Sequence, residues 1–318
     1  MSSFSIPIGG NSTTQEASKE LVQVQTQMVE FVLAFVLAVG GSAALALFSI
    51  AHMLWLEQWT NWLYYEKKLL RRRTALGSPS GNRDRLLWEN YTDIASLVLP
   101  PLLLLALFLQ PALRAHTVVF ALHPVDIVLS TLAIYLAMDA VYFWVHRALH
   151  EVPFLYRTIH KRHHDSLPVH VFITAKADPL ENLLAVSPGL CIWVLLTYYF
   201  IDVHFDADSG QRLFNLSTFL LPALTLVMEF NTGHSGYMDH WLLYVASPLQ
   251  WLIKALPFAR WVSAEHEEHH LSLKKNYAPM FRFFDQWAGT YEPPRFDKFA
   301  TSDVVESKLK QKPQKEQD

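Results

Sequence analysis

The amino-acid sequence predicts an all-α integral membrane protein with about four to five transmembrane helices. Of its 318 residues, 51% are hydrophobic and only 17% are charged, whereas about a quarter of the residues of a typical soluble domain are charged. Residues 31–50 form an apolar run without a charge, and a helix of about 20 residues spans a hydrocarbon core of about 30 Å. These observations exclude an ordinary soluble domain.

The first apolar run, residues 31–50, is predicted to be a transmembrane helix rather than a secretory signal peptide. The residues before it are polar, with Lys19 as their one base, which is not the basic start of a signal peptide. Prolines or polar residues interrupt the other candidate spans, and membrane helices tolerate them when neighbours satisfy the backbone. These candidates are residues 94–113, 124–145, 183–201 and 213–230.

One further apolar segment, residues 241–259, contains Lys254 and two prolines. We expect it to form an interfacial or re-entrant helix. The sequence then divides into a polar, disordered segment 1–27, transmembrane helices with a cytosolic loop in 28–145, a histidine-rich region with further membrane helices in 146–292, and a charged tail in 293–318.

The basic residues predict the orientation. If residues 31–50 run from the lumen to the cytosol, the cytosolic segments 56–93, 146–182 and 231–318 carry 23 of the 26 Lys and Arg residues. This distribution obeys the positive-inside rule. The histidine clusters then face the cytosol, and the sequon Asn11-Ser12-Thr13 faces the lumen, where it is accessible to glycosylation.

Two simple counts exclude other classes of site. The single cysteine, Cys191, lies in an apolar run, which leaves neither a disulfide framework nor a thiolate metal site. The net charge of -3 is uninformative by itself, because a nucleic-acid binder would show a basic excess on one face; no nucleic-acid partner is expected.

The histidines are the unusual feature, because 8 of the 15 occur in three clusters. HRALH spaces two histidines four residues apart, and HKRHH and HEEHH each place three at i, i+3 and i+4, so each cluster occupies one helix face. Pro153 is suited to open the helix that carries the second cluster. Eight imidazoles exceed the needs of one ion, which predicts a helical cap with a dinuclear metal site formed by His146, His150, His160, His163, His164, His266, His269 and His270.

A solvated basic face is the alternative interpretation. Lys or Arg would serve such a face equally well, and histidine is mostly neutral at pH 7, so the spacing favours metal coordination. His170 and His240 lie near the clusters but lack their spacing, and we leave them outside the ligand set. The solitary histidines are expected at the surface or in satisfied core positions; they are His52, His116, His123 and His204.

Imidazole binds zinc, copper, nickel and iron, so the ligand type leaves the metal open. In their order, HRALH, HKRHH and HEEHH resemble the three histidine boxes of the fatty acid hydroxylase and sterol desaturase superfamily of membrane di-iron oxygenases. The segments GHSGYMDHW (233–241) and AEHEEHHLSLKKNYAPMFRFFDQWAGTY (264–291) are similar to those of C-4 methylsterol oxidases. The resemblance covers about residues 130–292.

The resemblance implies that the eight box histidines bind two iron ions, with His234 as a further ligand. It also implies an O₂-dependent enzyme of the endoplasmic reticulum that hydroxylates, oxidises or desaturates an unactivated C–H bond of a lipid. A sterol is the first expectation, and a fatty acyl chain, sphingolipid or terpenoid remains open. Because the chain has no haem or flavin motif, a b-type cytochrome and an NAD(P)H reductase are expected as electron donors. Many members have a histidine before the proline that follows the second box, whereas this chain has Asp178, so no ligand role is assigned to it.

Three polar residues near the clusters each have two interpretations. Asp139 precedes His146 by seven residues and could orient an imidazole or make a polar contact within a span. Asn276 and Asp285 could order the segment after the third cluster or cap helices.

Two other classes of protein also use histidine. A zinc hydrolase would show H-E-x-x-H, and HEEHH contains this spacing at His266, Glu267 and His270, with His269 as an additional histidine, so this alternative stays open. A metal transporter would place its ligands at mid-membrane depth, whereas these clusters lie just outside the apolar runs.

Overall fold

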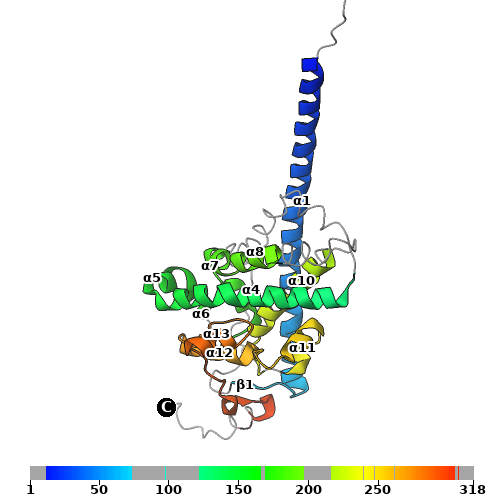
Figure 1. Ribbon diagram of the computed structural model, residues 1–318. Helices are drawn as coiled ribbons and strands as arrows, with labels where there is room; N and C mark the ends of the chain where they lie inside the picture. The colour runs from blue at the N-terminus through cyan, green and yellow to red at the C-terminus, as the bar shows by residue number, and fades with distance from the viewer. Residues whose placement is uncertain are drawn as a thin grey trace, which may run out of the picture.

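The computed structural model describes residues 12–73, 97, 122–165, 169–196, 216–238, 240–246, 248–260, 262–304 and 307. Their regular structure is almost entirely helical, in agreement with the predicted class (Figure 1). One two-stranded antiparallel sheet pairs β1 (Arg72–Arg73) with β2 (Phe299–Ala300). These strands join the segment after the first helix to the C-terminal region.

Helix α4 (Pro124–Glu151) forms the centre of the fold and packs against α8 (Ser187–Leu196) and α10 (Leu216–Gly233). The three helices share a buried core that includes Tyr135, Met138, Trp193 and Leu226. Gly189 permits the close approach of α8, because a Cβ atom at this position would lie 2.6 Å from Sδ of Met138.

Two buried hydroxyl-centred contacts also join these three helices. Ser130 Oγ donates to the carbonyl of Thr218 at 2.7 Å, and Trp193 Nε1 donates to Ser130 Oγ at 3.1 Å. The buried polar groups are therefore paired between helices.

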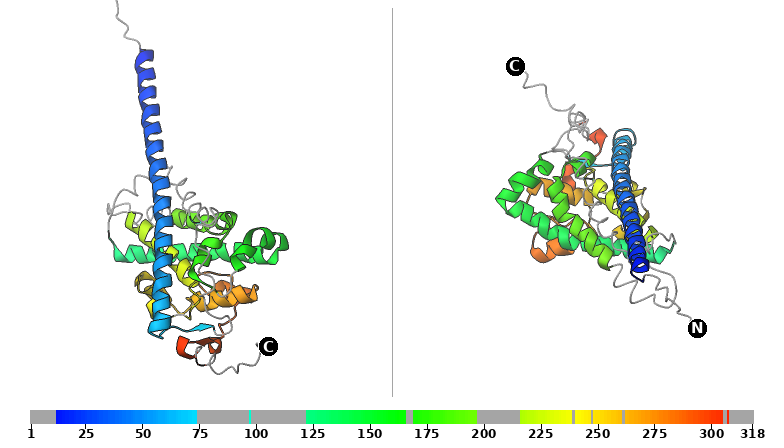
Figure 2. Two further views of the ribbon diagram at one scale, coloured as in Figure 1. Left: turned by 180° about the vertical axis from the view of Figure 1, so that it is seen from behind. Right: turned by 90° about the horizontal axis from the view of Figure 1, so that it is seen from above.

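The first helix, α1 (Ser12–Asn61), continues into a π-helical turn, η1 (Trp62–Glu66). Its N-terminal half projects beyond the other described elements, and its C-terminal half lies against them (Figures 1 and 2). Helix begins at Ser12, so residues 12–27 differ from the disorder that their polar composition predicted. Their Gln, Glu, Ala and Leu residues favour helix.

The elements that carry the second and third histidine clusters lie near the C-terminal half of α4, which carries the first (Figure 1). Pro153 opens the second cluster's helix, as predicted, at the first position of α5 (Pro153–Leu155). The helix continues as the π-helical η5 (Tyr156–His160) and as α6 (Lys161–His164). The third cluster lies on α12 (Val262–Ser272), and α13 (Phe283–Ala288) follows it.

Short elements complete the fold. They are η6 (Val171–Lys176), α7 (Pro179–Ala185), η8 (Trp241–Tyr244), α11 (Pro248–Lys254) and η9 (Phe296–Lys298). Helices η8 and α11 occupy the segment expected at an interface, and both are too short to span a membrane. Trp241 and Trp251 are largely exposed on them.

Three described helical stretches are long and apolar enough to cross a membrane: Gly40–Glu66, Pro124–Glu151 and Pro179–Leu196. They overlap the predicted spans 31–50, 124–145 and 183–201. Helix α10 overlaps the predicted span 213–230 but is not among the three, and residues 94–113, apart from Leu97, lie outside the described residues.

Candidate metal centre

All nine histidines predicted as ligands gather in two groups. The five-histidine group consists of His146, His150, His160, His164 and His269, and the four-histidine group of His163, His234, His266 and His270. Within each group the nitrogen atoms that could bind a metal lie within 4.8 Å of one another. The groups adjoin, because the ring centroids of His164 and His270 are 4.3 Å apart.

Both histidine triplets contribute to both groups. His160 and His164 enter the five-histidine group, and His163 enters the other; on α12 the division is reversed, with His269 alone in the five-histidine group. An α-helix turns by roughly 100° per residue, so i and i+4 point nearly together while the residue before i+4 diverges. Each helix thus supplies histidines to two neighbouring groups.

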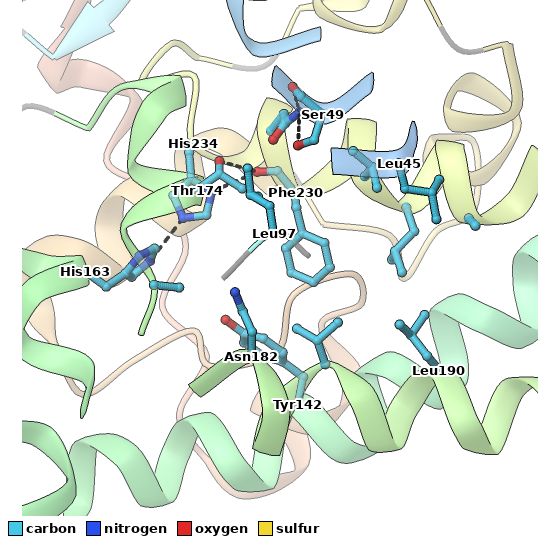
Figure 3. Close-up of a pocket in the computed structure, with 16 residues that line it drawn as sticks. Leu45, Ser49, Leu97, Tyr142, His163, Thr174, Asn182, Leu190, Phe230 and His234 are labelled. Carbon is cyan, nitrogen blue, oxygen red and sulfur yellow. Dashed lines mark hydrogen bonds between the residues drawn. The ribbon is translucent and has the colours of Figure 1, made fainter. Parts of the chain in front are cut away.

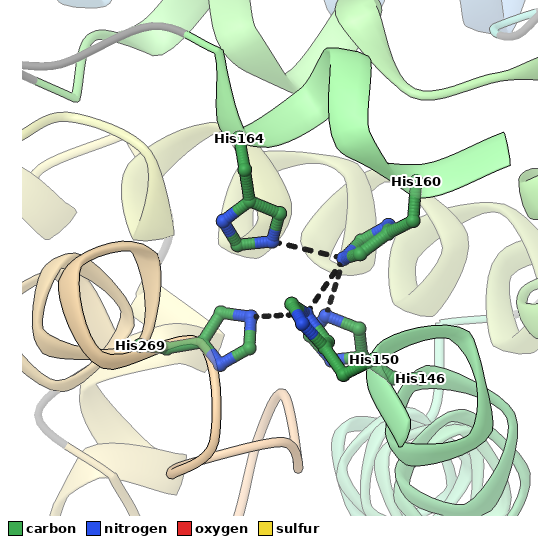
Figure 4. Close-up of side chains that lie close together, drawn as sticks. All are labelled: His146, His150, His160, His164 and His269. Atoms are coloured by element: carbon green, nitrogen blue, oxygen red, sulfur yellow. Dashed lines mark hydrogen bonds between the residues drawn. The ribbon is translucent and has the colours of Figure 1, made fainter. Parts of the chain in front are cut away.

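The Nε2 atoms converge within each group. In the five-histidine group, Nε2 of His160 lies 2.9 Å from that of His150, 3.1 Å from that of His146 and 2.9 Å from that of His164 (Figure 4). Nε2 of His269 lies 3.2 Å from that of His150.

The four-histidine group shows the same convergence. Nε2 of His234 lies 3.2 Å from that of His163 and 2.7 Å from that of His266. Nε2 of His270 lies 3.1 Å from that of His266.

Backbone carbonyls fix the opposite side of three rings. Nδ1 of His146 donates to the carbonyl of Tyr277 at 2.8 Å, and Nδ1 of His269 donates to that of Lys275 at 2.7 Å. Nδ1 of His234 donates to the carbonyl of Phe230 at 2.8 Å. A carbonyl oxygen only accepts, so Nδ1 carries the proton. In a neutral imidazole Nε2 then presents a lone pair to the group.

Burial keeps these rings neutral. It lowers the pKa of His234 to about 4. Burial, followed by the neighbouring histidines, lowers the pKa well below its usual value at His160, His163, His164, His266, His269 and His270. Where the Nε2 lone pairs of neutral rings face one another at about 3 Å, a cation between them satisfies all of them. The donor set therefore fits a metal ion in each group.

Glu181 is a buried partner of the site that the sequence analysis missed. It lies on α7, where its Oε2 is 2.8 Å from Nδ1 of His160, and 1% of its side chain is exposed. Ligating histidines commonly pair their second nitrogen with a carboxylate. An acidic residue in an otherwise apolar helix soon after the second box was the available signal.

The neighbouring Asp178 has a different role. Its side chain caps α7 by accepting from the backbone N–H of Leu180 at 2.8 Å. It belongs to neither histidine group.

The two interpretations of Asp139 are both replaced by a third. Its carboxylate accepts from the backbone N–H groups of Met280 at 2.7 Å and Phe281 at 2.8 Å, and it contacts no imidazole in the described structure. Asp139 thus fastens the segment after the third cluster to α4.

Asp285 and Asn276 order the same segment, as one interpretation predicted. Asp285 accepts from the N–H groups of Tyr277 and Ala278 at 2.8 and 2.9 Å. Asn276 adopts a left-handed conformation with φ 58°, which asparagine tolerates, and accepts from the N–H of Glu292 at 2.9 Å. These contacts position the Tyr277 carbonyl that holds His146.

The remaining described histidines lie outside both groups. His52 is buried and within 3.2 Å of Asn231, and His240 caps η8. His170 is buried, and burial lowers its pKa to about 3. His123 precedes α4, and His116 and His204 are not among the described residues.

An apolar cavity reaches the four-histidine group. It encloses about 860 Å³, including space open to the outside, and His163 and His234 line one end of it (Figure 3). Leu45 of α1, Leu190 of α8 and Phe230 of α10 line its walls. Its size and lining are those of a small-molecule site.

Comparisons with known proteins agree with this geometry. Methylsterol monooxygenase erg25A of Aspergillus fumigatus is 30% identical over 161 residues, which are 50% of this chain and 46% of that protein. Cholesterol 25-hydroxylase of Mus musculus is 28% identical over 155 residues, 49% of this chain and 44% of that protein.

Very-long-chain aldehyde decarbonylase GL1-4 of Oryza sativa subsp. japonica is 27% identical over 177 residues, 54% of this chain and 24% of that protein. The chain thus matches less than half the length of these relatives. No solved structure matches it. The family model for fatty acid hydroxylase matches residues 131–290, half of the chain and every residue of both histidine groups. The chain belongs to the fatty acid hydroxylase family.

Proposed function

We propose that this protein is a membrane-bound, O₂-dependent di-iron enzyme that hydroxylates, oxidises or desaturates an unactivated C–H bond of a lipid. One observation carries the proposal: two groups of neutral imidazoles lie side by side, and an apolar cavity ends at one of them. Membership of the family and relatives named as monooxygenase and hydroxylase support the oxygenase chemistry.

Iron is favoured over zinc for a chemical reason. Zinc has no redox chemistry, and O₂-dependent oxidation of a C–H bond requires a metal that changes its oxidation state. Two iron ions, when bound, would supply O₂ reduction and C–H cleavage. The ligands would be the five-histidine group for one ion and the four-histidine group for the other.

The protein's own residues orient the imidazole rings, bind the lipid and exclude water. The carbonyls of Tyr277, Lys275 and Phe230 hold three rings with Nε2 directed inward. Glu181 fixes His160 in the same way. The apolar cavity binds the lipid and keeps water away, and a lipid carbon at its end lies against His163 and His234.

A sterol is the first substrate expected, because a methylsterol monooxygenase and a cholesterol 25-hydroxylase are among the relatives. A fatty acyl chain, sphingolipid or terpenoid is the alternative. The other partners are O₂, membrane lipids, and a b-type cytochrome with an NAD(P)H reductase. We place the enzyme in the endoplasmic reticulum membrane with its histidines on the cytosolic side.

Reconstitution tests the proposal. Purified protein in lipid nanodiscs receives ferrous iron, an NAD(P)H-driven electron donor, O₂ and membrane lipids, and the products are identified by mass spectrometry. We expect an oxidised or unsaturated lipid, and ¹⁸O₂ incorporation separates oxygenation from desaturation. Product formation without O₂, or with zinc in place of iron, would instead indicate a hydrolase.

A further inference from the structure

Among the residues that line the cavity, Asn231 has a buried polar atom whose bonding is incomplete and which is not part of a histidine ring. Asn231 lines the cavity from α10, and no part of its side chain is exposed to solvent. Its Oδ1 atom has no hydrogen-bond partner among the described residues. Leaving a buried acceptor without a donor is energetically unfavourable, so the atom is suited to a donor that arrives with a ligand.

The orientation of the Asn231 amide follows from its neighbours. Nδ2 donates to the backbone carbonyl of Ser49 at 3.3 Å and lies 3.4 Å from Ser49 Oγ. It also lies 3.2 Å from Nδ1 of His52. The Ser49 carbonyl cannot donate, so the amide nitrogen must face it. Oδ1 is therefore the atom left for a ligand.

A second polar side chain of the cavity, that of Thr174, already makes a hydrogen bond. Thr174 lines the same space (Figure 3), and its Oγ1 donates to the carbonyl of Val171 at 2.9 Å. Thr174 Oγ1 therefore has a hydrogen-bond partner, whereas Asn231 Oδ1 has none among the described residues.

The place of Asn231 on α10 sets its distance from the metal centre. Asn231 precedes the ligand His234 by three residues, and both line the cavity. Side chains three residues apart on a helix are neighbours, with Cβ atoms about 5–6 Å apart. A group held by Asn231 therefore lies within one helical turn of the four-histidine group.

We propose that Asn231 Oδ1 accepts a hydrogen bond from a hydroxyl of the lipid substrate, and that the enzyme oxidises a carbon within about four bonds of that hydroxyl, a reach that corresponds to the short separation of Asn231 and His234. The substrate is accordingly a lipid alcohol that enters with its hydroxyl end toward the metal centre. Oxidation at the far end of a long lipid is excluded. This inference rests on the proposed lipid oxidation and specifies its substrate.

The first test maps the product. The reconstituted enzyme receives a 4-methylsterol, a long-chain 1-alkanol, and the O-methyl ether of each, which keeps the apolar body but cannot donate. We expect an alcohol to be oxidised within about four bonds of its hydroxyl, and its ether to react at least tenfold more slowly. Oxidation of an ether as fast as its alcohol, or at a remote carbon, would overturn the inference. Absence of product from all four lipids would count against the proposed function itself.

The second test uses variants and a binding measurement. Asn231→Leu keeps the volume but removes the acceptor, and Ser49→Ala is the matched control, because it keeps the backbone carbonyl that orients Asn231. Binding of each alcohol and ether is measured on metal-free protein through the shift in melting temperature. In wild type and Ser49→Ala we expect about tenfold tighter binding of the alcohol that reacts than of its ether.

In metal-free Asn231→Leu the alcohol and its ether should bind equally tightly. A separate, metal-loaded sample of this variant should retain its bound metal. A preference for the alcohol that persists in Asn231→Leu would show that another group reads the hydroxyl. Metal content and ether binding report whether the variant is folded, so a misfolded variant is recognised.

Discussion

Nδ1 of His160 lies 2.8 Å from Oε2 of Glu181, and neither side chain is more than 1% exposed. At this distance the carboxylate is placed to take the Nδ1 proton of His160 as a partner, an arrangement that would direct the Nε2 lone pair into the five-histidine group when a metal is bound. Glu181 comes from α7, which is separated in sequence from all three histidine clusters. This contact links the helix of a candidate span to the metal centre.

The first prediction is that Glu181→Gln weakens metal binding. The amide can still accept from Nδ1, but the negative charge that makes the imidazole a better ligand is gone. We expect the affinity for one of two ions to fall by about 10–100-fold, measured by competition with a chelator.

Asp178→Asn is the matched control for Glu181→Gln, because asparagine also caps helices and Asp178 lies outside both groups. It should leave metal affinity unchanged. Equal affinities in Glu181→Gln and wild type would remove Glu181 from the site.

The second prediction concerns the two groups separately. His269→Ala removes a ligand of the five-histidine group and His163→Ala one of the four-histidine group. Each variant should lose metal from its own group first, together with activity, while the spans still insert. His240→Asn, which changes only a cap of η8, should retain two equivalents of metal by elemental analysis. The ligand assignment fails if His163→Ala retains them as well.

The third prediction concerns Asp139. In Asp139→Asn an amide N–H faces the backbone N–H of Met280 or Phe281, which leaves a buried donor unpaired. We expect the free energy of unfolding to fall by about 1–3 kcal/mol and metal to dissociate faster, because the same segment carries the carbonyl that holds His146. Glu151→Gln, in an exposed pair with Arg147 on the same helix, should change stability by less than about 1 kcal/mol. Thermal unfolding of the two variants, recorded with and without metal, measures these changes in stability.

The sequence predicted which histidines gather, through helix spacing for the eight in the three clusters and through the family resemblance for His234; their role as ligands stays a prediction. All nine predicted histidines lie in the two groups. The division of each triplet between groups was not predicted, because it depends on how α6 and α12 face each other across the centre. The same limit applies to Glu181 and to the carbonyl of Tyr277, which reach the site through tertiary contacts and carry no spacing signal.

The fold was predicted where hydrophobic runs are long. Helix α4 agrees with the predicted span 124–145. Strands β1 and β2, with two residues each, are too short for a periodicity to appear. From the sequence, Asp139 was expected to orient an imidazole or to make a polar contact within a span. Its carboxylate instead accepts from the backbone of a segment 141 residues later in the chain.

The fourth prediction is a loss of stability in acid. Burial lowers the pKa of His170 to about 3 from 6.5 in the unfolded chain. The unfolded state therefore binds the extra proton, and the stabilisation present above pH 6.5 is lost as the pH falls toward 3. Each such histidine contributes about 1.4 kcal/mol per pH unit in this window.

Melting temperatures of metal-free protein between pH 7.5 and 5.0 measure this loss. His170→Phe should reduce the dependence on pH, since phenylalanine does not titrate. A melting temperature that is constant over this range, or equally steep in His170→Phe, would contradict the assignment.

The last prediction concerns topology. Helix α1 runs unbroken from Ser12 to Asn61, and the chain after it pairs through β1 with β2 near the C-terminus. If α1 spans the membrane, the sequon at Asn11 and the β1–β2 sheet lie on opposite sides. The distribution of Lys and Arg places the sheet in the cytosol. We therefore expect a glycan on Asn11 that Asn11→Gln abolishes, and a C-terminal sequon tag that stays unmodified in the same cells. A glycan on the C-terminal tag, with Asn11 unmodified, would reverse the orientation and place the histidine groups in the lumen, away from a cytosolic electron donor.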